Sequence, residues 1–515
     1  MLNAFRQAPR TQKSVSRSIA APVGGWNARD ALGAMDKTDA VTLQNFWPGT
    51  SDVVLRSGYT RYATGITGQV ESLISYSSGT AGKLFAAAGT AVYDVTAGGA
   101  VGAASLSGLT NARWQYINIT TAAASYSMML NGADKMRIFD GSAWHADGDG
   151  APYDITNVNS ATCANITLFK NRVWLIETGT LKAWYLPINS IGGAATALDM
   201  STIAMDGGYL MAAHTWTLDA GFGMDDYLAF ITSNGEVIVW RLTDPTTPTG
   251  IALIGVYRIG SPIGRRCMMK YGGDLLIITQ DGVVPMAASL QSSRLDPHVS
   301  LTDKITYAVS QSISNYGSTF GWQLCEHPKQ NQLYLNVPVS VGTQQQYVMN
   351  TITKSWCNFT GWYANCFQTY SDDLYYGGNG FVAKAWDGLA DDTSNINAVG
   401  LQSFQYYGAA QQKRCSMIRP HFLTNGSPSI YGDVNVDFDL SDTTAALAFA
   451  PTTYATWDNA VWDQNIWGVS LNPTAEWQGA TGIGFCFAPF IKTATQGIEL
   501  RWLSTDMVFE VGGVL

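Results

Sequence analysis

A short pattern recurs along most of this sequence: two apolar runs joined by a turn that contains glycine. In residues 169–187, the apolar residues 173–177 precede Thr178-Gly179, and a second run covers 180–185. Glycine readily adopts the positive φ that a two-residue hairpin turn requires, so the pattern predicts a β-hairpin. We therefore expect an all-β fold built from repeated hairpins. The same pattern surrounds seven glycines, which lie 36 to 60 residues apart: Gly89, Gly132, Gly179, Gly235, Gly282, Gly342 and Gly378.

This spacing is typical of β-propellers, in which a four-stranded blade recurs about every 40–50 residues. We predict an irregular β-propeller of about six to eight blade-like units, with seven of them between residues 70 and 387. A sandwich of hairpins is the alternative, because the spacing is uneven. The predicted organisation is a flexible basic arm over 1–22, a connector over 23–69, the propeller over 70–390, and a C-terminal β domain over 391–515 that completes or decorates the propeller.

Several units show a second pattern after the hairpin: a large apolar residue, then Asp or Asn, then Trp. Examples are Phe139-Asp140 with Trp144, and Asn350 with Trp356. An Asp or Asn side chain at this position can accept a hydrogen bond from the backbone two residues on and so start a turn. The Trp can then pack across the blade. The pattern resembles kelch-type repeats, and we expect its role to be structural.

The composition limits the kinds of partner that the chain can have. Charged residues make up only 13% of the sequence, about half of the ~25% usual in soluble domains. We therefore expect neighbouring subunits to cover much of the surface. The net charge of −9 argues against a general nucleic-acid-binding surface, which needs clustered Lys and Arg. An acidic wall past which nucleic acid slides remains compatible with this charge.

The cysteines and the apolar runs indicate the compartment. The seven cysteines are widely spaced and form no C-x-x-C pair, which predicts free, buried thiols in a reducing cytoplasm rather than a disulfide framework or a zinc site. The first 22 residues lack the apolar core of a signal peptide. The longest apolar run, near residues 482–491, is too short to span a bilayer. No membrane-spanning segment is therefore expected.

The first 22 residues are basic and show no clear period. They contain no acidic side chain and four basic ones: Arg6, Arg10, Lys13 and Arg17. A segment of this kind is either a solvated terminus or an arm that becomes ordered on an acidic partner or on nucleic acid. These four residues are therefore candidate partner contacts.

A run of tryptophans stands out near the other end of the chain. Trp457, Trp462 and Trp467 recur every five residues, a period that places their side chains on one face of neither a strand nor a helix. We expect a loop of repeated turns. The three indoles form either a local core or an aromatic contact surface for another subunit or a glycan. Further on, residues 497–511 alternate in polarity and are expected to form a final strand pair that meets the early strands.

The segment after the basic arm carries the residues of a known signature. They are Gly24-Gly25-Trp26-Asn27, then Ala40, Leu43, Asn45 and Pro48, and finally Arg56-Ser57-Gly58. This segment resembles the N-terminal signature of the tail-nozzle proteins of short-tailed bacteriophages, which are also called tail tubular protein B or tail hub proteins. The hairpin residues 169–174 and 182–187 are similar to the same family. The resemblance is diffuse, spans residues 23–515, and includes no catalytic motif.

The resemblance implies a structural virion protein with a β-propeller after the N-terminal segment. It implies a homohexameric ring at the distal end of the viral tail, below the adaptor that connects head and tail. Tail fibres or spikes would bind its flank, and genomic double-stranded DNA would pass through its lumen without sequence-specific binding. The protein would be assembled in the host cytoplasm. An acidic lumen would repel the phosphate backbone, so that DNA passes at ejection.

Two other functions are open alternatives. A receptor- or glycan-binding propeller would use the Trp457–Trp467 run to stack on sugars. A propeller glycosidase would need two carboxylates about 5–10 Å apart. The acid pairs Asp225-Asp226, Asp372-Asp373 and Asp391-Asp392 lie in polar stretches, where solvated charge is expected. The sequence contains no G-x-S-x-G or H-E-x-x-H motif and no phosphate-binding glycine loop, so we expect no enzyme, no cofactor and no metal site.

Overall fold

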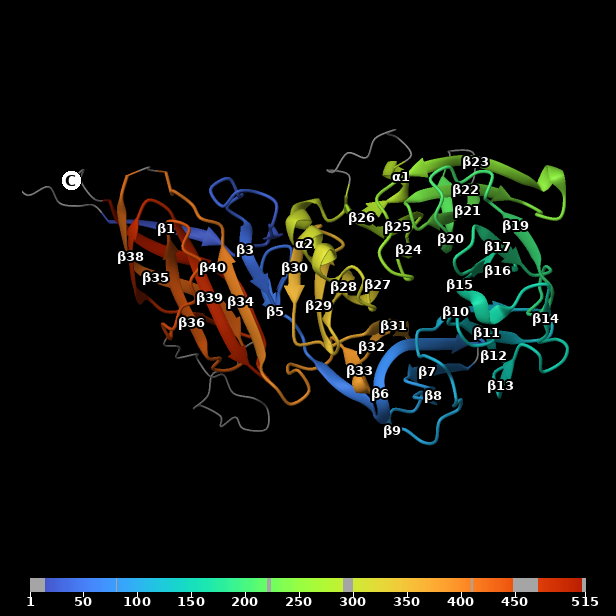
Figure 1. The fold of residues 1–515 in the computed structure, drawn as a ribbon. Helices are drawn as coiled ribbons and strands as arrows, with labels where there is room; N and C mark the ends of the chain where they lie inside the picture. Colours follow the sequence, from blue (N-terminus) through green and yellow to red (C-terminus); the bar gives the residue numbers. More distant parts are fainter. Residues whose placement is uncertain are drawn as a thin grey trace, which may run out of the picture. The chain divides into compact units, whose positions relative to one another are not determined.

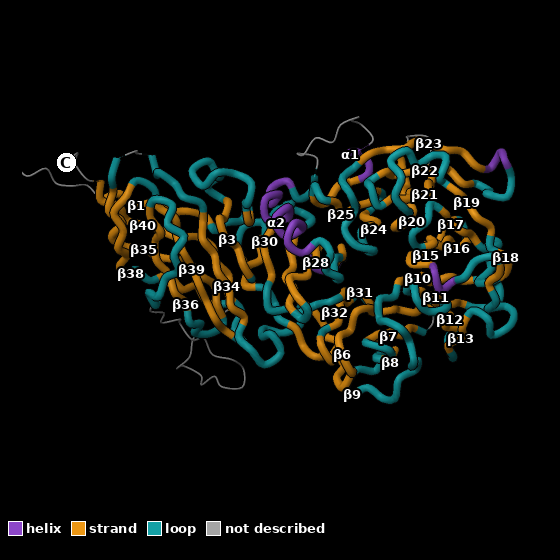
Figure 2. Tube along the Cα trace, viewed as in Figure 1, coloured by secondary structure: helices purple, strands orange, loops and turns teal. Residues whose placement is uncertain are grey.

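The computed structural model describes residues 14–79, 81–219, 224–289, 300–408, 411–447 and 471–511. The described chain is mostly strand (Figures 1 and 2), and its two α-helices are α1 (Met286–Ser289) and α2 (Thr306–Tyr316). The chain divides into two compact units. Unit 1 comprises Met1–Gly58, Asn350–Phe359 and Gly388–Leu515, and unit 2 comprises Tyr59–Met349 and Thr360–Asp387.

Unit 2 contains seven antiparallel blades in chain order, as the hairpin pattern predicts. The long strand β6 (Tyr59–Ser77) serves two of them, because residues 59–64 pair with the last blade and residues 70–77 with the first. The first three blades are β6 with β7 (Gly82–Ala88) and β8 (Ala91–Asp94); β10 (Gln115–Thr120), β11 (Ser125–Leu130), β12 (Arg137–Phe139) and β13 (Trp144–Ala146); and β15 (Cys163–Phe169), β16 (Arg172–Glu177), β17 (Lys182–Tyr185) and β19 (Thr196–Asp199).

The remaining four blades continue the series, and the two helices lie between the fifth and the sixth. These blades are β20 (Leu210–Asp219), β21 (Met224–Thr232), β22 (Glu236–Leu242) and β23 (Ile251–Arg258); β24 (Met268–Tyr271), β25 (Asp274–Thr279) and β26 (Gly282–Pro285); β27 (Gln323–His327), β28 (Gln332–Ser340) and β29 (Thr343–Asn350); and β31 (Cys366–Tyr370), β32 (Asp373–Gly377) and β33 (Asn379–Ala385) with β6.

Short elements connect these blades. They are β9 (Gly99–Ala100), which pairs with β6, the parallel pair β14 (Ile155–Thr156) and β18 (Gly193–Ala194), and the 3-10 turns Ser160–Thr162, Pro248–Gly250, Asp303–Ile305 and Pro328–Gln330.

The blades close into a ring, which makes unit 2 a β-propeller. The first strand of each blade contacts the first strand of the next, and β31 of the last blade contacts β6 of the first. Figure 1 shows these strands around a common centre. Apolar clusters fill the space between neighbouring blades; one combines Met128 and Ile138 of the second blade with Val173 and Leu175 of the third. Pairing of β6 with β33 then completes the last blade.

All seven glycines of the hairpin pattern lie at the turn between the second and third strands of their blades. Six of the seven have positive φ, and Gly378 is the exception. The second pattern is confirmed in the second blade, where the Asp140 carboxylate accepts hydrogen bonds at 2.7 Å from the backbone N–H of Ser142 and of Ala143. Trp144 packs with its ring centroid 5.1 Å from that of Phe85 in the first blade.

The described residues of unit 1 form two sheets that pack face to face. Their shared core includes Ile19, Cys415 and Met507 from one sheet and Val434 and Phe487 from the other. The first sheet is β4 (Phe46–Pro48), β5 (Val53–Leu55), β40 (Leu500–Val511) and β35 (Lys413–Thr424), with β1 (Ser14–Ala20), β37 (Asn472–Ala475) and β38 (Gln478–Gly484) at its sides. The second contains β30 (Trp356–Phe359), β3 (Asp39–Gln44), β34 (Ile396–Gln402), β39 (Phe487–Thr495) and β36 (Ile430–Val436), with β2 (Gly25–Trp26) beside β3.

The domain boundaries differ from the predicted ones. The end of the expected flexible arm is a strand, because β1 pairs with β40 along its whole length and buries Ile19 in the core. The expected connector is divided: residues 23–58 belong to unit 1 and residues 59–69 to strand β6. The expected C-terminal domain shares unit 1 with the N-terminal strands. The expected final strand pair is instead one strand, β40. The prediction that this end of the chain meets the early strands is confirmed, since β40 pairs with β1 and β5.

Two further findings concern the cysteines and the helices. All seven cysteines are buried and none forms a disulfide, as the spacing predicts. Within the described ranges, no helix has both the length and the apolar character needed to cross a membrane.

Candidate functional site: the centre of the propeller

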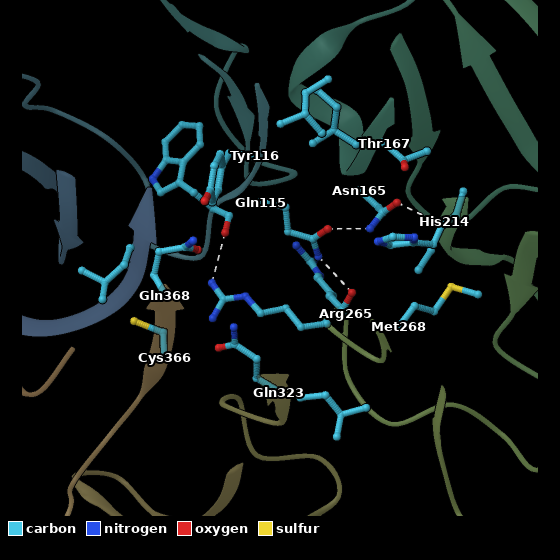
Figure 3. Close-up of a pocket in the computed structure, with 18 of the residues that line it drawn as sticks. Gln115, Tyr116, Asn165, Thr167, His214, Arg265, Met268, Gln323, Cys366 and Gln368 are labelled. Carbon is cyan, nitrogen blue, oxygen red and sulfur yellow. Dashed lines mark hydrogen bonds between the residues drawn. The ribbon is translucent and has the colours of Figure 1, made fainter. Parts of the chain in front are cut away.

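A cavity of about 230 Å³ lies where the seven first strands meet (Figure 3). Every blade contributes to its lining, so the closed ring of blades creates this space. Polar side chains are frequent in the lining, although the first strands are largely apolar elsewhere. One lining residue from each blade, in chain order, is Leu73, Gln115, Asn165, His214, Met268, Gln323 and Gln368.

Amide side chains connect the first strands of the second, third and fourth blades. The Asn165 Nδ2 donates to the Gln115 Oε1 at 2.5 Å, and the Asn165 Oδ1 accepts from the backbone N–H of Ala213 at 3.0 Å. Gln115 Nε2 donates to the carbonyl of Arg265 at 3.0 Å, as the dashed lines in Figure 3 show. These bonds fix both amides, so Gln115 and Asn165 form a rigid part of the wall.

A similar set of bonds connects the sixth, seventh, first and second blades. Gln323 makes two hydrogen bonds with the backbone of Phe367, at 3.0 and 3.1 Å. The hydroxyls of Tyr116 and Ser75 are 2.7 Å apart, and Gln368 Nε2 lies 3.4 Å from the Ser75 hydroxyl. The polar residues of the first strands thus hold neighbouring blades together around the cavity.

Two consecutive arginines supply positive charge to the cavity. Arg265 and Arg266 lie just before β24, and both line the space. Arg266 Nη2 donates to the Ser72 hydroxyl at 2.6 Å and to two carbonyls, those of Glu71 and Trp114, at 3.0 Å each. Burial lowers the pKa of Arg266 and the nearby Arg113 lowers it further, whereas Cys366 and Glu71 act in the opposite direction. The lowered pKa reflects chiefly the removal of the guanidinium from water.

The neighbouring groups carry little negative charge. Glu71 pairs with Arg113, whose Nε lies 3.2 Å from the Glu71 carboxylate. Both Arg113 and Arg266 lie over the ring of Phe320, with their guanidinium carbons 4.5 and 5.1 Å from its centroid. Cation–π contacts of this kind stabilise a guanidinium but do not neutralise it. The cavity therefore retains an excess of positive charge.

The remaining titratable lining groups are neutral at physiological pH. Burial lowers the pKa of His214, which favours the uncharged imidazole. Burial also raises the pKa of the Cys366 thiol to about 11, so Cys366 is protonated and a poor nucleophile. Over the described part of the chain, no group of three or more His, Cys, Asp or Glu residues could hold a metal ion. The two arginines are thus the charged groups among the residues that line the cavity.

The residues of the N-terminal signature form a separate network inside unit 1. Arg56 donates from Nη1 and Nη2 to the two oxygens of Asp391, at 2.7 and 2.6 Å, and from Nε to the Asn45 Oδ1 at 2.8 Å. Asn45 Nδ2 donates to the carbonyl of Asn397 at 2.6 Å. A Cβ added at Gly58 would lie 1.7 Å from the carbonyl oxygen of Ala390. These signature residues therefore fix the backbone before β6 against residues 390–397.

Hydrogen bonds and close packing also account for the residue types at the start of the signature, Gly24 and Asn27. Asn27 Nδ2 donates to Asp39 at 2.8 Å and to Asp30 at 2.9 Å. A Cβ at Gly24 would lie 2.5 Å from the Asp39 Oδ1. A residue with a side chain at position 24 would displace the carboxylate that holds Asn27.

Of the seven residues that the sequence singles out as contacts, the structure describes Arg17 alone. Arg17 lies exposed on β1, opposite Met507 of β40. The other six candidates, Arg6, Arg10, Lys13, Trp457, Trp462 and Trp467, lie outside the described residues.

Two of the acid pairs prove to be engaged in ion pairs. Asp391 was expected in a solvated loop, but it is buried against Arg56 because that guanidinium has its own partners in the core. Asp373 pairs with Lys329 and Lys384. The sequence reasoning missed Arg265 and Arg266; a pair of arginines before a short apolar strand was the available signal.

Comparisons with known proteins identify no family for this chain. No family model matches the sequence, and no curated protein sequence matches it significantly. Among solved structures, the crystal structure of BBS1N in complex with ARL6DN, soaked with lead, matches with a TM-score of 0.30 and 12% sequence identity, and covers 45% of this chain and 74% of that chain. A TM-score this low carries no argument about fold or function.

Proposed function

We propose that this chain is the nozzle subunit of a short bacteriophage tail. Six copies form a ring at the distal end of the tail, below the adaptor ring, and continue the DNA channel. The ring retains the packaged double-stranded DNA and lets it pass at ejection, while tail fibres or spikes attach to its flank. The role is structural and is performed in the virion, after assembly in the host cytoplasm.

The observation that carries the proposal is where the signature residues lie. Asn45, Arg56 and Gly58 are separated in the sequence, yet they take part in one buried arrangement with Asp391 and Ala390. Residues that maintain a fold are arranged in this way, whereas residues of an active site converge on an open cavity. The arrangement supports the interpretation that the signature marks a shared subunit architecture.

Composition also supports a subunit of a channel. The charged fraction of 13% suits a chain that buries much of its surface against copies of itself, and head-to-tail contacts between identical subunits close into rings. The net charge of −9 suits a wall that repels phosphates, so that DNA slides past it.

The test is to image the assembly with which the protein purifies and to average the images without imposed symmetry. A sixfold ring with a central channel at the distal end of the tail is the expected result. A monomer in mature particles, or particles that lack the protein, would overturn the proposal. The receptor-binding alternative predicts instead that the isolated chain binds host polysaccharide saturably, and that Trp462→Ala abolishes this binding while assembly is unchanged.

A further inference from the structure

We propose that the cavity at the centre of the propeller binds a small phosphate-type oxyanion, which Arg265 and Arg266 hold. All seven blades line the cavity, and the two arginines are the positive groups of its lining. Arg265 is labelled in Figure 3. The proposal concerns unit 2 alone and does not depend on the nozzle function.

The first argument is the balance of charge. Glu71 is the carboxylate that acts on Arg266, and it pairs with Arg113 at 3.2 Å, while Arg113 itself lies near both Arg265 and Arg266. Within the described ranges, neither Arg265 nor Arg266 forms an ion pair. This matters for Arg266, because a guanidinium that is largely taken out of water without a counter-charge is unfavourable, and a bound anion removes this cost.

The second argument is the hydrogen bonding of Arg266. Its Nη2 is held by three uncharged oxygens, at 2.6 to 3.0 Å. Its Nη1 is buried and, across the described chain, has no acceptor. One side of the guanidinium is therefore fixed, whereas the buried Nη1 lacks an acceptor, which an oxyanion packed against it would supply. A fixed guanidinium with free donors is suited to bind an oxyanion through two parallel hydrogen bonds.

Arg265 is the more accessible of the two. Its Nη1 donates to the carbonyl of Asn131 at 3.0 Å, and this is the acceptor that the structure gives to its side chain. Its own carbonyl is held by Gln115, which anchors the backbone between the two arginines and the wall. Arg265 can thus contact an anion that is bound to Arg266 inside the cavity.

The charge and the size of the cavity favour phosphate. Two uncompensated guanidinium groups match a phosphate group, which carries about −1.5 to −2 at pH 7, better than a monocarboxylate. The volume of about 230 Å³ is below the roughly 300–1,000 Å³ of pockets for drug-sized ligands. The amides of Gln115 and Asn165 are bonded to each other, and the amide of Gln323 is bonded to the backbone of Phe367. The wall is therefore preorganised, and binding orders few side chains.

The experiment is isothermal titration of the purified full chain with inorganic phosphate, at constant ionic strength in chloride. The native chain is expected to bind phosphate at one site. Arg265→Gln and Arg266→Gln are each expected to weaken binding by about tenfold or more, because each removes charge-assisted hydrogen bonds. Arg258→Gln is the matched control, since Arg258 is an exposed arginine of β23 in the same unit. This variant is expected to bind phosphate with the affinity of the native chain.

Arg265→Gln keeps the test valid if Arg266→Gln fails to fold, because Arg265 is exposed and makes a single side-chain bond. Glycerol phosphate titrated in parallel distinguishes the source: tighter binding than inorganic phosphate assigns the site to a phosphate ester, and equal or weaker binding assigns it to free phosphate. The absence of binding to the native chain, native affinity in Arg265→Gln, or acetate binding as tight as phosphate would each overturn the proposal.

Discussion

Arg56 and Asp391 form a buried ion pair although 335 positions separate them in the sequence. Both oxygens of the carboxylate accept hydrogen bonds from the guanidinium, and the Arg56 side chain has no exposed surface. Asn45 binds the remaining Nε and reaches Asn397 with its own amide. The pair thus connects the N-terminal strands of unit 1 with the segment that enters its C-terminal strands.

Removing one member of this pair is expected to destabilise unit 1 strongly. Asp391→Ala removes the carboxylate that accepts two hydrogen bonds from the buried Arg56 guanidinium, which costs about 3–5 kcal/mol in free energy of unfolding. Asp442→Ala is the control, because Asp442 pairs with Lys492 at the surface with 60% of its side chain exposed, and it should cost less than about 1 kcal/mol. Urea denaturation followed by tryptophan fluorescence measures both. Equal losses in the two variants would contradict the structural importance of the buried pair.

Gly58 is expected to tolerate no side chain. The Cβ of Gly58→Ala would lie 1.7 Å from the carbonyl oxygen of Ala390, and the backbone must move to relieve the clash. We expect a loss of stability of about 1–3 kcal/mol or more, as for other overpacked sites. Gly479→Ala in the same unit is the control, since no atom lies within 4 Å of its added Cβ. A comparable loss at position 479 would show that the close approach to Ala390 is unimportant.

Alanine substitutions at two turn glycines of the propeller distinguish the cost of backbone strain from the cost of steric crowding. Gly179 and Gly235 occupy the same turn in different blades with φ of 72° and 88°. An added Cβ meets nothing at Gly179, but at Gly235 it lies 2.3 Å from the carbonyl of Ile259. Gly179→Ala should cost about 1–2 kcal/mol, the penalty for a left-handed residue. Gly235→Ala should cost clearly more, and equal melting temperatures for the two variants would contradict this account.

The hairpins could be predicted because their signal is local. Gly132 and Gly235 adopt φ values of 77° and 88°, which side chains disfavour, and apolar runs flank both turns. The pairing that closes the ring is not local. It joins residues 59–64 of β6 to β33, more than 300 positions later, and no pattern at either end specifies the other. The boundary placed at residue 69 was therefore wrong for β6.

Other features of the structure were also missed or could not be predicted from the local sequence. Ile305, Val309 and Ile313 are buried at a spacing of four, a helical pattern that the hairpin interpretation overlooked in α2. Asp391 lies in a polar stretch, and its burial depends on the distant Arg56. The polar lining residues, such as Asn165, are single polar positions within apolar strands. Their convergence on a cavity follows only from ring closure.

The stability of unit 1 should depend on the ionisation of Asp506. Burial alone would raise the pKa of Asp506, but hydrogen bonds from His421, Ser18 and Arg419 outweigh it and lower the pKa to about 2. This value is below the roughly 3.9 of an unfolded Asp. The stabilisation is therefore present above about pH 4 and is lost as the pH falls toward 2.

The measurement for Asp506 compares the native chain with Asp506→Asn in urea at several pH values between 6 and 2.5. The native chain should be more stable at pH 6, and the difference should shrink as the pH falls below about 4. Other carboxylates with lowered pKa values, such as Asp140 in the propeller, contribute to both proteins and cancel in the difference. A difference that is independent of pH would show that Asp506 does not stabilise the fold through its charge.

The seven cysteines should be unreactive until the chain unfolds. All seven are buried, and burial raises the pKa of Cys163, Cys267 and Cys325 to about 12. Because the thiolate is the reactive form, a disulfide reagent such as Ellman's reagent at pH 8 should modify no thiol rapidly in the native chain and all seven in guanidinium chloride. Ser107→Cys, at an exposed loop position, should add one fast thiol and so show that the reagent is active. A fast thiol in the unsubstituted native chain would mean that the cores around these cysteines open readily, and fewer than seven thiols after unfolding without reductant would reveal a disulfide.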